Sequence, residues 1–270
     1  MSYLKELDVA KSAAENAATI IREFANNEEF KINLKGKNDL VTDADLASEK
    51  KIIEVIKATF PNDLILAEES SHYKSLPSER IWIIDPIDGT TNFAHGFPVY
   101  CVSIALWENG EAKVGLVHEV AHDELFWAVE GQGAWFNDKK IKISGITEPS
   151  ESLIGTGFPY NNLDLVENYL KLFKVMMDKT HGVRRPGSAA WDLCNVACGR
   201  IEGFYEYGLS PWDVAAATLI IKEAGGIIFD WKGEQNWLFG QRIVAGNKPI
   251  CDFLLTEIGE CFSEEMLSLD

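Results

Sequence analysis

Acidic residues follow short apolar runs or open a helix-like stretch at three separate places in the sequence. Glu68 and Glu69 follow one apolar run. Asp85 and Asp88 follow a second run, and Asp213 opens a stretch typical of a helix. Hard cations such as Mg²⁺ take oxygen ligands, few of them from the protein, and keep coordination positions for water and phosphate. Carboxylates from three elements that meet at one sheet edge therefore predict a divalent-cation site.

The turn between Asp85 and Asp88 supports this interpretation. Pro86 fixes one backbone angle between the two aspartates, so their carboxylates are held in a stiff turn at the exit of a buried strand. The backbone carbonyl of Ile87 lies in the same turn and offers one further oxygen ligand. The local sequence thus predicts two carboxylates and a carbonyl in fixed relation to one another.

The residues Gly-Thr-Thr-Asn at 89–92 offer backbone amides and hydroxyls beside these acids. A helix that begins here presents an anion site at its N-terminus, and Thr90 is placed to orient a water molecule with Glu68 or Asp45. Each acid also has an ordinary structural role. Asp213 suits a first helical turn, and Asp45 fits a helix-start pattern. For Asp45 we weigh capping and catalysis equally, and both can hold.

Hydrophobic periodicity predicts helices and strands that alternate along the chain. An opening helix spans 3–26 and a second helix spans about 43–58, whereas the polar segment 31–37 is expected to be a mobile loop. Asn109-Gly110 between two apolar runs indicates a hairpin. The other expected strands and helices cover 64–67, 81–84, 99–107, 112–118, 124–130, 134–136, 153–156, 163–179, 188–198, 203–206, 211–224 and 227–230.

This order of elements predicts an α/β fold in which two packed sheets are flanked by helices. The sequence has no repeat and no composition break typical of a linker. We therefore expect a single catalytic domain over 1–270. A soft internal boundary near residue 145 separates an N-terminal α+β half from a C-terminal α/β half.

Charge and composition exclude some partners. The 270 residues include 42 acidic and 25 basic ones and carry a formal charge of −17, which disfavours nucleic acid and anionic membrane surfaces. Five cysteines without dense spacing indicate reduced thiols. No apolar run approaches the roughly 20 residues of a membrane span, and the N-terminus lacks a signal-peptide core. We expect a cytoplasmic protein. If its partner is a small phosphorylated metabolite, cations held by the carboxylates must screen the phosphate charge.

The sequence resembles the inositol monophosphatases at motifs that follow the family's order. Residues 85–98 are similar to the first signature of that family, and 211–216 with 223–226 are similar to the second. The other matching positions are Lys37, 38–42, Asp45, Glu68, Glu69 and 187–190. The resemblance covers nearly the whole chain, and several motifs in order are far more specific than any one of them.

This resemblance implies an αβαβα sandwich of the sugar-phosphatase type, shared with fructose bisphosphatases and nucleotide bisphosphate phosphatases. It implies a lithium-sensitive, Mg²⁺-dependent hydrolase that is a homodimer. It also implies a phosphatase that transfers the phosphoryl group directly to a metal-activated water without a phosphoenzyme. Inositol monophosphate is then the first candidate substrate. NADP, fructose 1,6-bisphosphate and adenosine 3′,5′-bisphosphate are alternatives for the same chemistry.

The resemblance also implies roles for individual residues. Glu68, Asp85 and the Ile87 carbonyl match the ligands of one magnesium ion. Asp85, Asp88 and Asp213 match those of a second. Glu69 matches a ligand of a weaker third ion. An additional acid, Asp43, stands where the family often has a small residue.

The remaining matches concern water and substrate. Thr90 with Asp45 and Glu68 matches the group that positions the attacking water, and Lys37 lies on the loop that closes over the metals. The positions that match contacts to phosphate or to substrate hydroxyls are Asp88, Gly89, Thr90, Gly187, Ser188, Ala189, Glu206 and Asp213.

Two other classes of protein share parts of this pattern. Phosphatases with an aspartate nucleophile also carry an Asp-rich motif that ends in Gly-Thr, but one residue separates their aspartates. Here two residues separate Asp85 from Asp88, and the Trp212-Asp213 motif has no counterpart in that class. A non-catalytic module that binds divalent cations is a more distant alternative. Magnesium-dependent release of phosphate separates these possibilities.

Overall fold

The structure, a computed structural model, describes residues 3–27, 32–36, 39–70 and 75–268. Its helices are α1 (Leu4–Asn27), α2 (Asp43–Thr59), α3 (Thr90–Ala94), α4 (Val166–Lys179), α5 (Ala189–Ala197), α6 (Pro211–Glu223), α7 (Lys248–Cys261) and α8 (Glu264–Ser268). Its strands are β1 (Ile32–Gly36), β2 (Asp39–Thr42), β3 (Leu64–Ala67), β4 (Ile81–Asp88), β5 (Cys101–Glu108), β6 (Glu111–Glu119), β7 (Glu124–Val129), β8 (Ala134–Phe136), β9 (Lys139–Ile141), β10 (Leu153–Thr156), β11 (Gly182–Arg184), β12 (Gly203–Tyr207), β13 (Ile227–Phe229) and β14 (Arg242–Gly246).

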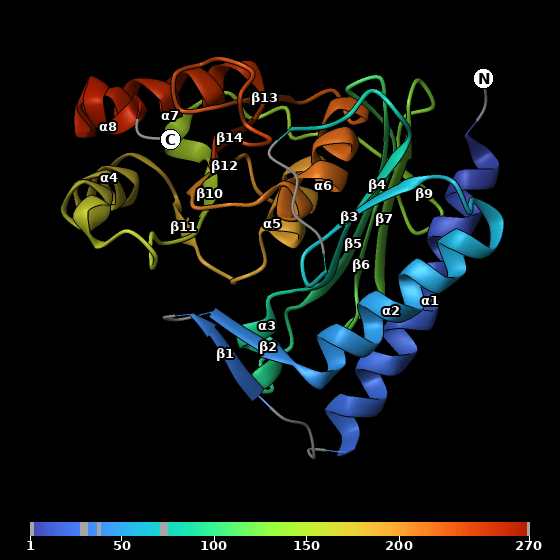
Figure 1. The fold of residues 1–270 in the computed structure, drawn as a ribbon. Coiled ribbons are helices and arrows are strands. Elements are labelled where there is room, and N and C mark those ends of the chain that lie inside the picture. The colour runs from blue at the N-terminus through green and yellow to red at the C-terminus, as the bar shows by residue number, and fades with distance from the viewer. Residues whose placement is uncertain (1–2, 28–31, 37–38, 71–74, 269–270) are drawn as a thin grey trace.

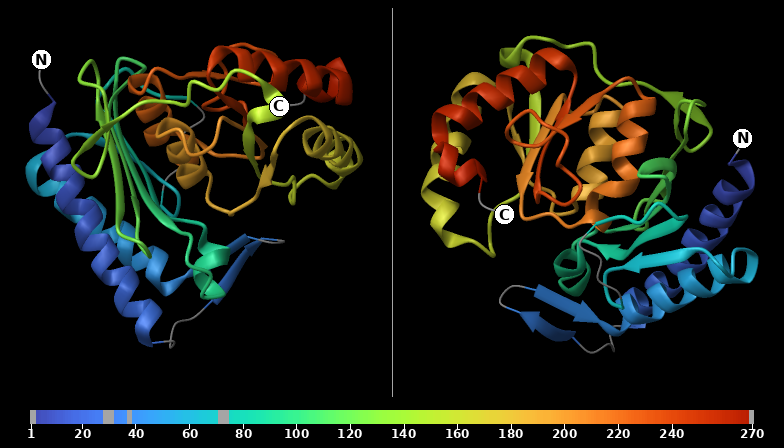
Figure 2. Two further views of the ribbon diagram at one scale, coloured as in Figure 1. Left: turned by 180° about the vertical axis from the view of Figure 1, so that it is seen from behind. Right: turned by 45° about the horizontal axis from the view of Figure 1, so that its top comes forward.

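Helices and sheets alternate in layers (Figure 1). Helices α1 and α2 cover one face of a seven-stranded sheet in the order β3-β4-β5-β6-β7-β8-β9. Helices α5 and α6 pack on its other face and also contact the five-stranded sheet, whose order is β11-β10-β12-β14-β13. Helices α4 and α7 cover the far side of that second sheet, as Figure 2 also shows. This arrangement confirms the expected αβαβα sandwich.

Strand β4 lies inside the larger sheet and is buried on both faces. Ile81 and Ile83 belong to the apolar cluster on the side of α6, whereas Trp82 and Ile84 belong to the cluster on the side of α1 and α2. Successive side chains of a strand point to opposite faces, so an uninterrupted apolar run suits a strand between two helix layers. The apolar residues 81–84 therefore hold β4 between two helix layers, and the aspartates that follow them lie at the edge of the sheet.

Helix α6 is apolar on all sides because it lies between the two sheets. Its buried residues run without a break from Val214 to Ile221. Gly115 of β6 permits the close approach, since a Cβ atom there would lie 2.4 Å from the carbonyl oxygen of Ala216. Helix α6 also contacts β4, so its N-terminal Asp213 is carried toward the acidic end of that strand.

The sequence predictions hold for most elements between 3 and 230. The hairpin at Asn109-Gly110 is confirmed, with positive φ angles of 54° and 74° at the two turn residues. None of the helices in the described ranges is long and apolar enough to cross a membrane.

The predicted loop over 31–37 is wrong for its middle part. Residues 32–36 form β1, which pairs antiparallel with β2 through Ile32 opposite Thr42 and Leu34 opposite Leu40. Residues 32–35 alternate apolar and polar side chains, which is a strand signal that the loop prediction overlooked. Lys37, expected on this loop, lies outside the described residues. Strands β2, β9, β11 and β14 and helices α7 and α8 had no predicted counterpart.

Candidate active site

Three carboxylates from two elements meet at the edge of the larger sheet. Asp85, Asp88 and Asp213 each offer an oxygen, and these three atoms lie within 4.8 Å of one another. Asp85 and Asp88 come from the end of β4, and Asp213 comes from the first turn of α6. The sequence therefore placed these three acids together correctly.

A bulge in β4 aims its two aspartates. The register between β4 and β5 shifts between Asp85 and Asp88, so the strand departs from regular pairing at these residues. The Ile87 amide donates a hydrogen bond of 2.9 Å to Asp85 Oδ1. Bulges re-aim side chains at the ends of strands, and this one sets the predicted stiff turn.

The other two carboxylates are held by helix N-termini. Asp88 Oδ2 accepts hydrogen bonds from the Ser188 hydroxyl at 2.7 Å and the Ala190 amide at 2.6 Å. Asp213 Oδ2 accepts from the Ser210 amide at 2.7 Å, as part of a capping box. Amides at the start of a helix favour a negative charge, so α5 and α6 orient these acids as part of their own capping.

The cluster carries unfavourable electrostatics that a cation would relieve. Burial raises the pKa of Asp85 well above its usual range, and the charges of Glu68, Asp88 and Asp213 raise it further. Burial likewise raises the pKa of Asp213, with the charge of Asp88 adding to the effect. Neighbouring carboxylates in a low-dielectric site cannot all ionise without a counter-charge. The donor set, all oxygen and mutually repelling, fits a hard divalent cation.

Glu68 and Glu69 lie in the turn after β3, beside this cluster. Both are half-buried. The charge of Glu68 raises the pKa of both Asp85 and Asp213, which places it within electrostatic reach of the cluster. The Glu69 amide donates a 2.8 Å hydrogen bond to buried Glu49 and so fixes the turn.

Thr90 joins Asp45 to this site. Its hydroxyl oxygen lies 2.9 Å from Asp45 Oδ1 and 2.9 Å from the Ile87 carbonyl oxygen. The other oxygen of Asp45 accepts from the amide of Thr42 at 2.8 Å and completes the capping box of α2. Asp45 therefore caps its helix, as predicted, while its second oxygen faces Thr90.

A pocket of about 350 Å³ adjoins the cluster on the side of α5 and β12. Its lining brings together six residues that the sequence had singled out, namely Asp88, Gly187, Ser188, Ala189, Glu206 and Asp213. It also includes residues that the sequence reasoning missed, namely Thr156, Gly157, Arg185, Asp192 and Leu209. The pocket is polar and lies directly beside the predicted metal ligands.

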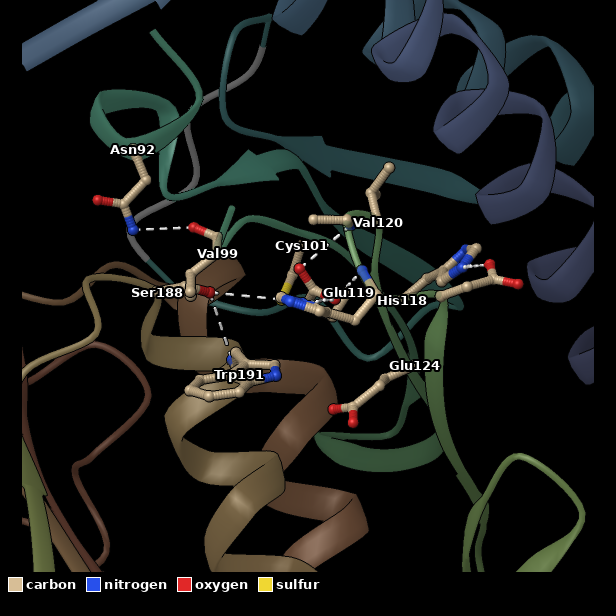
Figure 3. Close-up of polar contacts among 12 residues, drawn as sticks. Asn92, Val99, Cys101, His118, Glu119, Val120, Glu124, Ser188 and Trp191 are labelled. Atoms are coloured by element: carbon tan, nitrogen blue, oxygen red, sulfur yellow. Dashed lines mark hydrogen bonds and ion pairs between the residues drawn. The ribbon is translucent and has the colours of Figure 1, made fainter. Parts of the chain in front are cut away.

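The wall near Gly187 is held by the side chain of Asn92. Asn92 donates a hydrogen bond of 2.8 Å to the carbonyl oxygen of Val99, as Figure 3 shows. It donates a second one of 2.9 Å to the carbonyl oxygen of Pro186. Gly187 has a φ of +99°, and a Cβ atom there would lie 3.0 Å from the Asn92 amide. The Ser188 hydroxyl also lies 3.4 Å from the sulfur of Cys101. This wall is therefore rigid, and Gly187 cannot carry a side chain.

Glu206 lies at the opposite wall, on β12. Burial raises its pKa to about 8, although the charge of Arg185 acts in the other direction. Strand β10 pairs with β12 with Thr156 opposite Tyr205, which brings Gly157 beside the carboxyl group. A Cβ atom on Gly157 would lie 1.7 Å from Glu206 Oε1, so any larger residue there displaces the carboxyl group from this position. In the sequence, only Gly157, directly after the predicted strand 153–156, indicated that this wall approaches another group closely.

Comparison with known proteins agrees with this geometry. The sequence model of the inositol monophosphatase family matches residues 4–261. The chain belongs to the inositol monophosphatase family. The structure of the inositol monophosphatase from Anabaena (Nostoc) sp. PCC 7120 superposes with a TM-score of 0.85 at 38% identity, covering 97% of this chain and 98% of that one.

Relatives in this family carry two kinds of name. The inositol monophosphatase of Dictyostelium discoideum is 40% identical over 257 residues, which are 93% of each chain. The Nus factor SuhB of Pasteurella multocida (strain Pm70) is 38% identical over 260 residues, 96% of this chain and 97% of the relative. Family membership and these structural neighbours make this inositol monophosphatase homologue a phosphatase, an enzyme that hydrolyses phosphoric monoesters.

Proposed function

We propose that this phosphatase is Mg²⁺-dependent and hydrolyses the monophosphate of a small polyol, with inositol monophosphate as the first candidate. The observation that carries the proposal is the group of three carboxylate oxygens within 4.8 Å beside a polar pocket. The cluster suits hard cations, and the adjoining pocket is lined by polar groups that can bind hydroxyl groups. NADP, fructose 1,6-bisphosphate and adenosine 3′,5′-bisphosphate are alternative substrates of the same site.

The proposed ligands form two main groups and one weaker site. Glu68, Asp85 and the Ile87 carbonyl hold one ion, while Asp85, Asp88 and Asp213 hold the second. Glu69 assists a third. When bound, such ions stabilise negative charge on the phosphate and on the leaving oxygen and lower the pKa of water. The mutual repulsion of the carboxylates supports this assignment.

Thr90 orients the attacking water. A hydroxyl group has one hydrogen, and Asp45 Oδ1 at 2.9 Å is the charged acceptor for it. The lone pairs of Thr90 Oγ1 then accept a hydrogen bond from the water and aim its oxygen at phosphorus. The new bond joins that oxygen to phosphorus while the phosphorus–ester oxygen bond breaks. The water gives up one proton and the leaving oxygen takes one up, so the products are the alcohol and hydrogen phosphate. The step inverts the configuration at phosphorus.

The backbone at Gly89 and Thr90 binds the phosphate. Gly89 has a φ of +97°, and a Cβ atom there would lie 2.9 Å from the Val99 carbonyl oxygen. The turn into α3 therefore requires glycine and exposes amides beside the carboxylate cluster. Across the pocket, the hydroxyl groups of the alcohol bind to Gly187, Ser188, Ala189 and Glu206.

The remaining parts of the proposal concern the whole molecule. The site draws residues from both sides of residue 145, which supports one catalytic domain over 1–270. A homodimer is proposed from the family resemblance alone. Lithium sensitivity follows from the family resemblance. A cytoplasmic location and the absence of nucleic-acid and membrane partners follow from composition and charge.

Phosphate release from a substrate panel tests this function. The panel contains inositol 1-phosphate, fructose 1,6-bisphosphate, NADP and adenosine 3′,5′-bisphosphate, each assayed with Mg²⁺, with a chelator, and with Mg²⁺ plus Li⁺. We expect turnover that the chelator abolishes and Mg²⁺ restores, with the highest kcat/KM for inositol 1-phosphate. Full activity in the chelator would contradict the metal-dependent mechanism. A higher kcat/KM for another member of the panel would reassign the substrate.

A further inference from the structure

Asp192 is a buried acid of the pocket that the function above does not use. It lies in the first turn of α5 and is 2% exposed. Its backbone amide bonds to Ser188 within the helix. Its carboxyl group, however, makes no hydrogen bond or ion pair with any other residue of the described ranges, although it lines the pocket. A buried carboxyl group without a partner is unusual and points to a ligand.

The energetic situation of this carboxyl group is unfavourable in the free protein. Burial raises the pKa of Asp192 well above its usual range, and the negative charges of Glu206 and Asp88 raise it further, whereas the charge of Arg185 acts in the other direction. Burying a polar group without a hydrogen bond costs on the order of 1–3 kcal/mol in proteins. An asparagine or a small apolar residue would avoid the charge repulsion, so stability does not explain an acid here.

Strand β10 leaves room for both acids of the pocket. A Cβ atom on Gly155 would lie 2.9 Å from Ile201 and 3.5 Å from Asp192 Oδ1. A Cβ atom on Gly157 would overlap the Glu206 carboxyl group. Gly155 lies in β10, and Gly157 directly follows the last residue of that strand. The segment 155–157 therefore leaves space for the two carboxyl groups.

We propose that Asp192 and Glu206 form a two-carboxyl subsite that binds hydroxyl groups of the substrate and selects against substrates with a second anionic group. This inference rests on the proposed phosphatase function and assigns Asp192 as a specificity-determining residue. Two carboxyl groups give acceptors on two sides of the pocket, which suits adjacent hydroxyls on one ring. A second phosphate at this position would lose its hydration beside two buried carboxyl groups, which costs more than placing a hydroxyl group there.

Arg185 brings a positive charge to the same pocket. Its guanidinium group also lines the pocket and stacks over the ring of Tyr160 at 5.3 Å. It is exposed, whereas Asp192 is almost fully buried. The charge of an exposed cation is screened by water, so it offsets little of the cost of burying a second phosphate beside Asp192. The competing outcome is that Arg185 attracts a second phosphate and Asp192 has no influence.

The test compares wild type, Asp192→Asn and the control Asp178→Asn. Asp178 is an exposed residue at the end of α4, so the control removes the same charge from the surface. The kcat/KM is measured with Mg²⁺ for inositol 1-phosphate, fructose 1,6-bisphosphate and p-nitrophenyl phosphate. Asp192→Asn should lose on the order of 10- to 100-fold more kcat/KM on inositol 1-phosphate than on p-nitrophenyl phosphate, the range for a hydrogen bond to a charged group. Its ratio of bisphosphate to inositol 1-phosphate activity should rise at least tenfold.

Other outcomes overturn the inference in distinguishable ways. An equal loss on all three substrates, or no change in their ratios, would assign Asp192 to structure alone. Asp192→Ser is the second variant if Asp192→Asn does not fold, and failure of both to fold also overturns the subsite. A wild-type protein that hydrolyses none of the three compounds with Mg²⁺ would instead overturn the proposed function, and the subsite with it.

Discussion

The carboxylate cluster on β4 and α6 and the pocket between β10, β12 and α5 are neighbouring regions that are built differently. In the cluster, Asp85, Asp88 and Asp213 each accept a hydrogen bond from a backbone amide. In the pocket, Asp192 and Glu206 have no such donor among the described residues. The first region is therefore oriented by the fold, whereas the second keeps its hydrogen-bonding capacity for a ligand. Substitutions in the cluster should therefore change the chemical step, whereas substitutions in the pocket should change the choice of substrate.

The largest expected effect comes from the shared ligand of the cluster. Asp85→Asn removes a charge assigned to both ions, and we expect kcat to fall on the order of 10³-fold or more, as for loss of a charge-stabilising group. The fold should remain, because the variant also removes repulsion from the cluster. Steady-state kinetics and a thermal melt in chelator measure both effects. Wild-type activity in this variant would disprove the assignment of the ligands.

Thr90 should have the next largest effect. Thr90→Val keeps the shape of the side chain and removes the hydroxyl that joins the water to Asp45, so kcat should fall about 10²-fold, as for loss of a proton-handling group. The matched control is Thr91→Val, because Thr91 is exposed on the same short helix. A KM effect with unchanged kcat would mean that Thr90 binds substrate and does not orient water.

A smaller and more selective effect is expected in the pocket. Gly157→Ala places a methyl group where the Glu206 carboxyl group lies, so that carboxyl must move. We expect kcat/KM for inositol 1-phosphate to fall on the order of tenfold, the value of one charged hydrogen bond, with a smaller loss on p-nitrophenyl phosphate. Gly259→Ala is the control, since nothing lies within 4 Å of its Cβ position. Equal losses on both substrates would show that the two regions are not separable.

The smallest effect is on the pH dependence of stability. The pKa of Glu206 is raised to about 8 in the folded protein, from 4.5, so the folded state binds a proton more tightly than the unfolded chain. The contribution of this group to the free energy of unfolding is therefore fully present below about pH 4.5 and is lost as the pH rises toward 8. In chelator, the melting temperature of wild type should fall over that interval. Glu206→Gln should reduce the fall by a few degrees. If the melting temperature of Glu206→Gln fell with pH as steeply as that of wild type, the buried state of this carboxyl group would be contradicted.

The sequence could predict the cluster because its signals are local. Pro86 lies between Asp85 and Asp88, and the apolar run of β4 directly precedes them. Asp213 stands in a recognisable helix start after Ser210 and Pro211. Each of these features is contained within a few residues, so each could be interpreted before the fold was known.

The pocket and parts of the fold could not be predicted for the opposite reason. Asp192 lies within a stretch typical of a buried helix, and its importance depends on Glu206 and on two glycines in β10 and directly after it. That juxtaposition follows from the parallel register of β10 and β12, which no local pattern specifies. Strand β1 was missed for a different reason. Its residues 32–35 alternate apolar and polar side chains, but this short stretch before Gly36 also suits a loop.

The most direct test of the account is a crystal of this protein soaked in Mn²⁺ and measured for anomalous scattering. Manganese takes the same oxygen ligands as magnesium and can be located by its own signal. The account predicts peaks bounded by Asp85, Asp88 and Asp213, with Glu68 and the Ile87 carbonyl at the first of them. Peaks only elsewhere, with these three carboxylates turned away from one another, would contradict it.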